Sequence, residues 1–147
     1  MPHLVILYTA NLDAEADMTL LCRALADTML AVRDEGGVPV FPTGGVRVLA
    51  YPAAHSAVAD GGAAGVAAGG SGEYAFVYLN LRMGRGRSAA VRQQVGDALT
   101  ASAKAHLAPL FAPRIDRMHI GLTLQIDEGA EVFDAKHSSL HPLFDKA

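Results

Sequence analysis

The chain has 147 residues, of which 51% are hydrophobic and 18% charged, and its formal net charge is −3. A single domain is expected at this length, and its core is large enough to exclude a disulfide-stapled miniprotein and a disordered chain. The sequence has no basic block, which argues against nucleic-acid binding, and no uncharged run long enough for a membrane span. The low share of charged residues therefore points to association between copies of the chain.

The first half of the chain predicts a strand, a helix and a second strand. The apolar run at residues 3–9 is typical of a strand buried on both faces. A helix is expected from about Ala14 to Arg33, ended by Gly36-Gly37, and a strand near Val46 to Tyr51. The apolar stripe of this helix is Met18, Leu21, Leu25, Met29 and Val32.

A segment rich in Gly and Ala, residues 61–72, predicts a flexible surface loop, after which the pattern repeats. We expect a strand from Tyr74 to Met83, a helix from its N-cap Ser88 to about Ala108, closed by Pro109, and a strand from His119 to Ile126. The inner stripe of this second helix is Val91, Val95, Leu99 and Ser102.

The order of elements predicts two β-α-β units, at about 2–51 and 74–126, within one domain of residues 1–147. Helices between strands imply parallel pairing inside each unit. The repeat predicts an α+β fold, a four-stranded sheet with two helices on one face. Residues 131–147 are expected to form an edge excursion or arm. One layer of helices leaves the other face uncovered, so we expect that face to meet another copy.

Common catalytic motifs are absent: the sequence has no HExxH, GxSxG or P-loop, and no GxGxxG after the first strand. His137 and His141 are four residues apart, but Pro142 and the lack of a helix there argue against a metal site. Cys22 is the single cysteine; it excludes internal disulfides and is expected to be a core thiol. The start of the chain does not resemble a signal peptide, which predicts a cytoplasmic location.

Pro2 follows the initiator methionine and directly precedes a buried strand. Removal of Met1 would make its secondary amine the chain terminus, and burial against apolar neighbours lowers the pKa of such an amine. A neutral amine near pH 7 is a general base. The alternative is a proline that merely begins a strand, where its missing N–H costs nothing.

Arginines mark two candidate anion sites. Arg87 lies where a Gly-Arg-Gly turn meets the second helix, and helix N–H groups together with a guanidinium favour a carboxylate there. Arg85 and Arg92 add positive charge nearby, and the alternative is a solvated basic turn. Arg47 is the lone charge in a long apolar stretch, which makes it either an edge residue facing water or a ligand clamp.

Four segments in chain order carry a family resemblance. They are Pro2-His3-Leu4, Gly45-Val46-Arg47, Tyr74-Ala75-Phe76-Val77, and Gly86-Arg87-Ser88 followed by Arg92-Gln93-Gln94. Together they resemble the 5-carboxymethyl-2-hydroxymuconate Δ-isomerase family of the tautomerase superfamily, over nearly the whole chain. The Gly-Arg-Ser and Arg-Gln-Gln block is the most specific of them.

The resemblance implies a homotrimer that uses no cofactor and acts on a small carboxylate substrate during homoprotocatechuate breakdown. Pro2 would move the proton, while Arg47 and Arg87 would bind carboxylates and stabilise the dienolate, with Arg85 and Ser88 as further substrate-binding residues.

The chain also departs from the family pattern. Leu49 stands where relatives carry a second arginine, Pro52-Ala53-Ala54 replaces aromatic residues, and the segment at 61–72 is longer. Two alternatives therefore stay open. One is a tautomerase for a different unsaturated 2-hydroxy or 2-oxo acid, and the other is a non-catalytic trimeric binding module.

Overall fold

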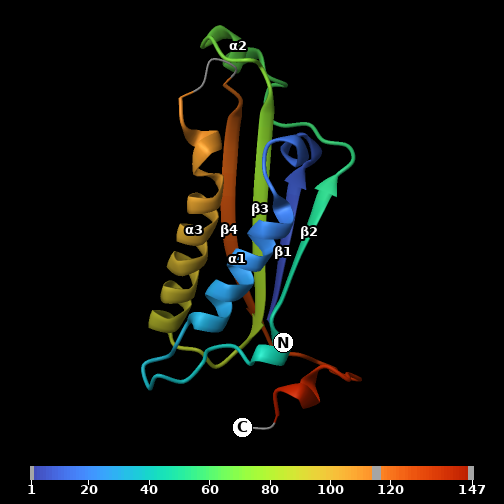
Figure 1. Cartoon of the computed structure of the whole chain (residues 1–147), viewed down its shortest axis with the longest axis vertical. Coiled ribbons are helices and arrows are strands. Elements are labelled where there is room, and N and C mark those ends of the chain that lie inside the picture. Colours follow the sequence, from blue (N-terminus) through green and yellow to red (C-terminus); the bar gives the residue numbers. More distant parts are fainter. Residues whose placement is uncertain (1, 114–116, 146–147) are drawn as a thin grey trace.

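A four-stranded sheet and two long helices on one of its faces make up most of the computed structural model, which describes residues 2–113 and 117–145 (Figure 1). Its strands are β1 (His3–Thr9), β2 (Arg47–Ala53), β3 (Tyr74–Gly84) and β4 (His119–Gly129), and its long helices are α1 (Met18–Ala31) and α3 (Ala89–Phe111). The strand order is β2-β1-β3-β4, with β1 parallel to β2, β3 parallel to β4, and β1 antiparallel to β3. This confirms the α+β fold and the parallel pairing inside each unit.

The core lies between the sheet and the two helices. Alternate residues of the central strands, such as Ile6 and Leu79, are fully buried, as period-2 alternation requires. The predicted helical stripes are confirmed in the main. In α3, however, Ala103 rather than Ser102 is buried, because the spacing after Leu99 is four residues rather than three. Among the described helices, none is long and apolar enough to cross a membrane.

The predicted ends of both helices need correction. α1 begins at Met18 rather than near Ala14, because the Asp17 carboxylate caps it by accepting the Leu20 N–H at 3.0 Å. A 3-10 turn, η1 (Ala10–Ala14), precedes it. α3 begins after Ser88, as predicted, but continues past Pro109 to Phe111, since buried Leu110 holds its last turn against the core.

The expectation that the first strand is buried on both faces is wrong. Leu4 and Ile6 are fully buried, but Leu7 on the opposite side of β1 is 47% exposed. Both long helices cover the same face, so the other face, here called the open face, has no cover within the described part of the chain. Its apolar side chains include Val5, Leu7, Leu49, Tyr51, Phe76 and Tyr78.

The Gly/Ala-rich segment, predicted as a flexible surface loop, is partly helical and closely packed. It contains a short helix, α2 (Ala63–Ala67), and the Gly65 N–H donates to the Tyr74 hydroxyl at 3.0 Å. Gly62 has a φ of 106°, and a Cβ at that position would collide with the carbonyl of Gly72. Glycine therefore serves here to pack two chain segments tightly rather than to loosen them.

Residues after β4 return beneath the sheet. They include a 3-10 turn, η3 (His141–Leu143), which lies against a second turn, η2 (Thr43–Gly45). A Cβ on Gly44 would lie 3.2 Å from a ring carbon of Phe144, so the lack of a side chain at Gly44 permits the close approach. We call residues 131–145 the arm.

A matched pair of substitutions tests how α1 is buried. Leu21 is fully buried and Leu20 is 59% exposed. We expect Leu21→Ala to lower the free energy of unfolding by about 3 kcal/mol, and Leu20→Ala to change it by less than about 0.5 kcal/mol. Urea unfolding followed by circular dichroism at one protein concentration measures both. Equal losses would show that α1 packs on a different face.

Candidate active site

One end of the sheet gathers the residues that the sequence singled out. Because β1 and β2 run antiparallel to β3 and β4, this end holds the first residues of one pair and the last residues of the other. His3 at the start of β1 is opposite Arg47 on β2 and opposite Arg82 on β3. Pro2 precedes His3 directly and is buried. The structure thus places Pro2 and Arg47 at the same sheet end.

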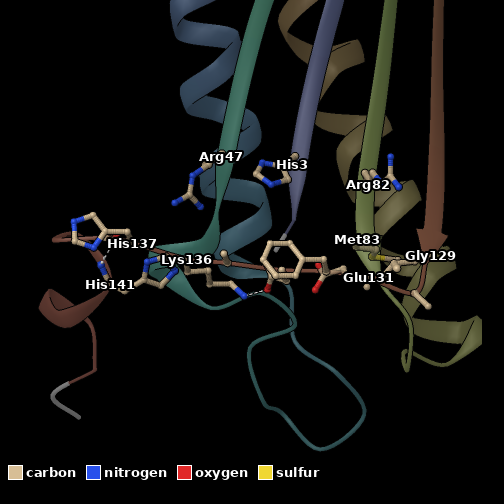
Figure 2. A pocket seen from close by; sticks show the side chains of 16 residues that line it. His3, Arg47, Arg82, Met83, Gly129, Glu131, Lys136, His137 and His141 are labelled. Atoms are coloured by element: carbon tan, nitrogen blue, oxygen red, sulfur yellow. Dashed lines mark hydrogen bonds and ion pairs between the residues drawn. The ribbon is translucent and has the colours of Figure 1, made fainter.

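A pocket of about 570 Å³ opens here between the sheet end and the arm (Figure 2). The strands supply His3, Arg47 and Arg82 to its lining. From the arm come acidic and basic side chains, including Glu131, Asp134, Lys136, His137 and His141. In the arm, Lys136 forms an ion pair with Asp134. On the strand side, the cationic groups of the lining are the guanidinium groups of Arg47 and Arg82.

Arg47 is held in place by the backbone of the turn before it. Its Nη1 donates to the carbonyl of Gly45 at 3.0 Å and to that of Gly44 at 3.4 Å, and the side chain is half-buried. These bonds use one nitrogen of a guanidinium that has five N–H donors, so the rest of the fork stays available to a carboxylate.

The histidine beside Arg47 is shifted toward its neutral form. Partial burial and the Arg47 charge lower the pKa of His3 below its usual 6.5, while Glu131 opposes the shift. A lowered pKa leaves the imidazole neutral near pH 7, so it serves there as a hydrogen-bonding group rather than as a cation.

Arg87 lies in a different place. Its guanidinium donates to the carbonyls of Gly84 at 2.9 Å and Val40 at 3.2 Å, and it lies 5.3 Å from the centre of the Phe41 ring. Arg85, Arg87 and Ser88 line a separate pocket of about 350 Å³. Within one chain, the structure therefore does not bring Arg87 and Arg47 together.

The neighbours of Arg87 are engaged in structural contacts. The Ser88 hydroxyl donates to the carboxylate of Glu35 at 2.6 Å and accepts the Val91 N–H at 3.2 Å as the N-cap of α3. Arg92 pairs with Glu128 at 3.0 Å. Hydrogen bonding to Ser88 lowers the pKa of Glu35, which keeps this acid ionised at the pocket edge.

Sequence reasoning missed Arg82 and most arm residues of the pocket, and it considered His137 and His141 only as metal ligands. Arg82 has the alternation of an outward-facing strand residue, but only the β1–β3 register shows that it is level with His3 and Arg47. No group of three or more His, Cys, Asp or Glu side chains in the described ranges could hold a metal ion. Cys22 is half-buried against the core, and burial raises its thiol pKa.

Comparison with known proteins gives consistent matches along the whole chain. A model of the family described as 5-carboxymethyl-2-hydroxymuconate isomerase matches residues 2–144. A 5-carboxymethyl-2-hydroxymuconate Delta-isomerase from Escherichia coli is 29% identical over 144 residues, which cover 98% of this chain and 99% of that protein.

Solved structures agree. A crystal structure of a 5-carboxymethyl-2-hydroxymuconate delta-isomerase has 61% sequence identity and a TM-score of 0.93, covering 100% of this chain and 95% of that one. A 5-carboxymethyl-2-hydroxymuconate isomerase from Deinococcus radiodurans R1 has 34% identity and a TM-score of 0.76, covering 99% and 95% of the two chains.

The coupling between Arg47 and His3 is open to direct measurement. Arg47→Gln removes a positive charge that lowers the His3 pKa, so we expect that pKa to rise. Titration of the His3 ring resonances by NMR measures the shift, and Lys104→Gln on the exposed side of α3 is the control for net charge. An unchanged His3 midpoint in Arg47→Gln would show that the two side chains do not interact in solution.

Proposed function

The chain belongs to the 5-carboxymethyl-2-hydroxymuconate isomerase family, and from that premise we propose that it isomerises 5-carboxymethyl-2-hydroxymuconate itself by proton transfer, without a cofactor. Family membership makes the protein an isomerase. The observation that supports this substrate is the pocket with His3, Arg47 and Arg82 on its strand side, because His3 is the residue that follows Pro2. By its chemistry, the reaction serves breakdown of homoprotocatechuate.

In this proposal Pro2 carries the proton. After removal of Met1, the neutral secondary amine of Pro2 accepts the proton of the dienol hydroxyl and becomes an ammonium group. The same proton then returns to a carbon of the dienolate, which restores the amine and completes the isomerisation without an oxidant or a reductant. Burial of Pro2 supports this role because it disfavours the charged ammonium form.

Arginines hold the substrate and stabilise its charge. Arg47 binds one carboxylate from the strand side of the pocket, and the positive field there favours the dienolate that forms after proton removal. Arg87, assisted by Arg85, Ser88 and the N-terminus of α3, binds a carboxylate in the same reaction.

A complete site requires more than one copy of the chain in this proposal. Arg47 and Arg87 line separate pockets of one chain, so a substrate that contacts both meets them on different copies. The open face supports such an arrangement, because its exposed apolar side chains gain stability when covered. We place two sister copies against it, in a homotrimer.

One feature favours a second candidate within the same chemistry. Leu49 lies two residues after Arg47 on the open face and is 47% exposed. An apolar side chain beside the cationic residues favours a substrate with an apolar group there, such as another unsaturated 2-hydroxy or 2-oxo acid.

The proline mechanism predicts loss of activity in Pro2→Ala. Turnover of 5-carboxymethyl-2-hydroxymuconate is followed by its ultraviolet change, and kcat should fall about 10²-fold or more when the proline amine is lost. Pro109→Ala, at an exposed position of α3, is the matched control and should keep its activity. Intact-mass measurement must show removal of Met1 in the wild type.

The outcomes separate the open alternatives. Retention of Met1 contradicts the proline mechanism. Full activity in Pro2→Ala points to a structural proline and another base. A wild type that accelerates nothing, with either acid class as substrate, indicates the binding module.

The shared site predicts complementation between inactive variants. Light scattering should first give the mass of three chains for the wild type. We expect Arg47→Ala and Arg87→Ala each to lose turnover when expressed alone, and co-expression to restore part of it, because mixed assemblies contain sites with both arginines. If mixed assemblies form but remain inactive, the two arginines do not meet in one site between copies.

A further inference from the structure

We infer that Arg82 is a substrate-specificity residue that, together with Arg47, selects extended acids with two separated carboxylates. This inference deepens the proposed function and rests on it, because it assigns the pocket at the sheet end to the substrate.

The sheet register sets the geometry. His3 on β1 is level with Arg47 on β2 and with Arg82 on β3, so the three residues form one row across three adjacent strands on the open face. Neighbouring strands are about 4.8 Å apart, which puts the backbones of the two arginines roughly 10 Å from each other. All three side chains line the same pocket. Figure 2 shows them on its strand side, with Arg47 and Arg82 on either side of His3.

Arg82 differs from Arg47, the other arginine that lines this pocket, in having no hydrogen-bond or ion-pair partner among the described residues; the turn residue Arg85, which lines the smaller pocket, has none there either. Arg47 and Arg87 donate to backbone carbonyls, and Arg92 pairs with Glu128. In the described part of the chain, no hydrogen bond or ion pair is found for the exposed guanidinium of Arg82. A side chain with five donors that lines a pocket is suited to a bidentate carboxylate.

The acids near Arg82 have other partners. Asp127 is opposite Arg82 on β4, but its carboxylate accepts the amide N–H of Asn80 at 2.8 Å. Asp134 pairs with Lys136 in the arm. Glu131 acts on His3, where its charge opposes the lowering of the His3 pKa. The carboxylates of Asp127 and Asp134 thus contact partners other than Arg82 in the described part of the chain.

Row geometry and pocket size together define the ligand class. A pocket of about 570 Å³ is within the range of small-molecule sites. A short monocarboxylate reaches one arginine only, whereas an extended acid with carboxylates at both ends reaches Arg47 and Arg82 across the neutral His3. The second contact gives the dicarboxylate its advantage, because each charge-assisted pair adds to the binding free energy.

The test compares two inhibitors of equal chain length. Adipate has a carboxylate at each end, and hexanoate has one. In Arg82→Gln we expect adipate to bind more weakly, so that its inhibition constant rises about tenfold or more. The inhibition constant of hexanoate should change by less than about twofold. Arg82→Lys should keep part of the adipate affinity. Lys104→Gln, on the exposed side of α3, is the control for loss of one positive charge.

A second variant separates ligand binding from a structural ion pair. If Arg82 serves only to balance Asp127, then Asp127→Asn should reproduce the behaviour of Arg82→Gln, and that result overturns the inference. Equal weakening of both inhibitors in Arg82→Gln also overturns it. Selective loss of adipate with Asp127→Asn near wild type supports it.

Failure of the proposed function has a different signature. If the wild type does not turn over 5-carboxymethyl-2-hydroxymuconate, the proposed function fails, and calorimetric titration of adipate and hexanoate still tests Arg82. Turnover in the wild type with no selective effect in Arg82→Gln contradicts the inference alone.

Discussion

The antiparallel pairing of β1 with β3 is the constraint on which the other features depend. Each β-α-β unit alone has two parallel strands that start at one end and finish at the other. Joining the units antiparallel brings the starts of β1 and β2 to the ends of β3 and β4. The parallel pairing of β1 with β2 already places the start of β1 beside Arg47, and the antiparallel pairing with β3 brings Arg82 to the same end.

The same sheet explains why the chain is so apolar. α1 and α3 lie on one face, and the residues beneath them are fully buried. On the open face Leu7, Leu49 and Tyr51 remain about half exposed. Burying a large apolar side chain contributes about 1.5–3 kcal/mol to the free energy of folding or association. A single chain does not gain this contribution from the side chains of the open face. The high hydrophobic share of the sequence is therefore divided between a core that one chain fills and a second surface that it leaves open.

Sequence patterns locate the strands well and the ends of the helices less well. The strand at residues 3–9 is easily predicted because an apolar run can be recognised without knowing which strands pair with it. The pattern misplaces the start of α1 because several acidic residues precede it, and only geometry shows that Asp17 is the cap. The helix position of Arg87 predicts an anion ligand, but its carbonyl partner on Val40 is 47 residues away and invisible to a local pattern. Arg82 could not be predicted as a pocket residue from the sequence. The alternation of a strand predicts which face of the sheet a residue is on, but not which residues of the neighbouring strands are opposite it.

The arm and the beginning of β1 lie at the same end of the molecule, next to the pocket (Figure 1). His141 and Phe144 of the arm pack against Gly44, which has no side chain to keep them away. The Gly44 carbonyl also accepts a hydrogen bond from Arg47. Under the proposed function, an affinity tag before Pro2 would block its amine, and a fusion partner joined after the arm would be close to the residues of the arm that line the pocket. An exposed residue of α2 such as Ala67, at the opposite end of the sheet, is the better place to attach a label through a side chain.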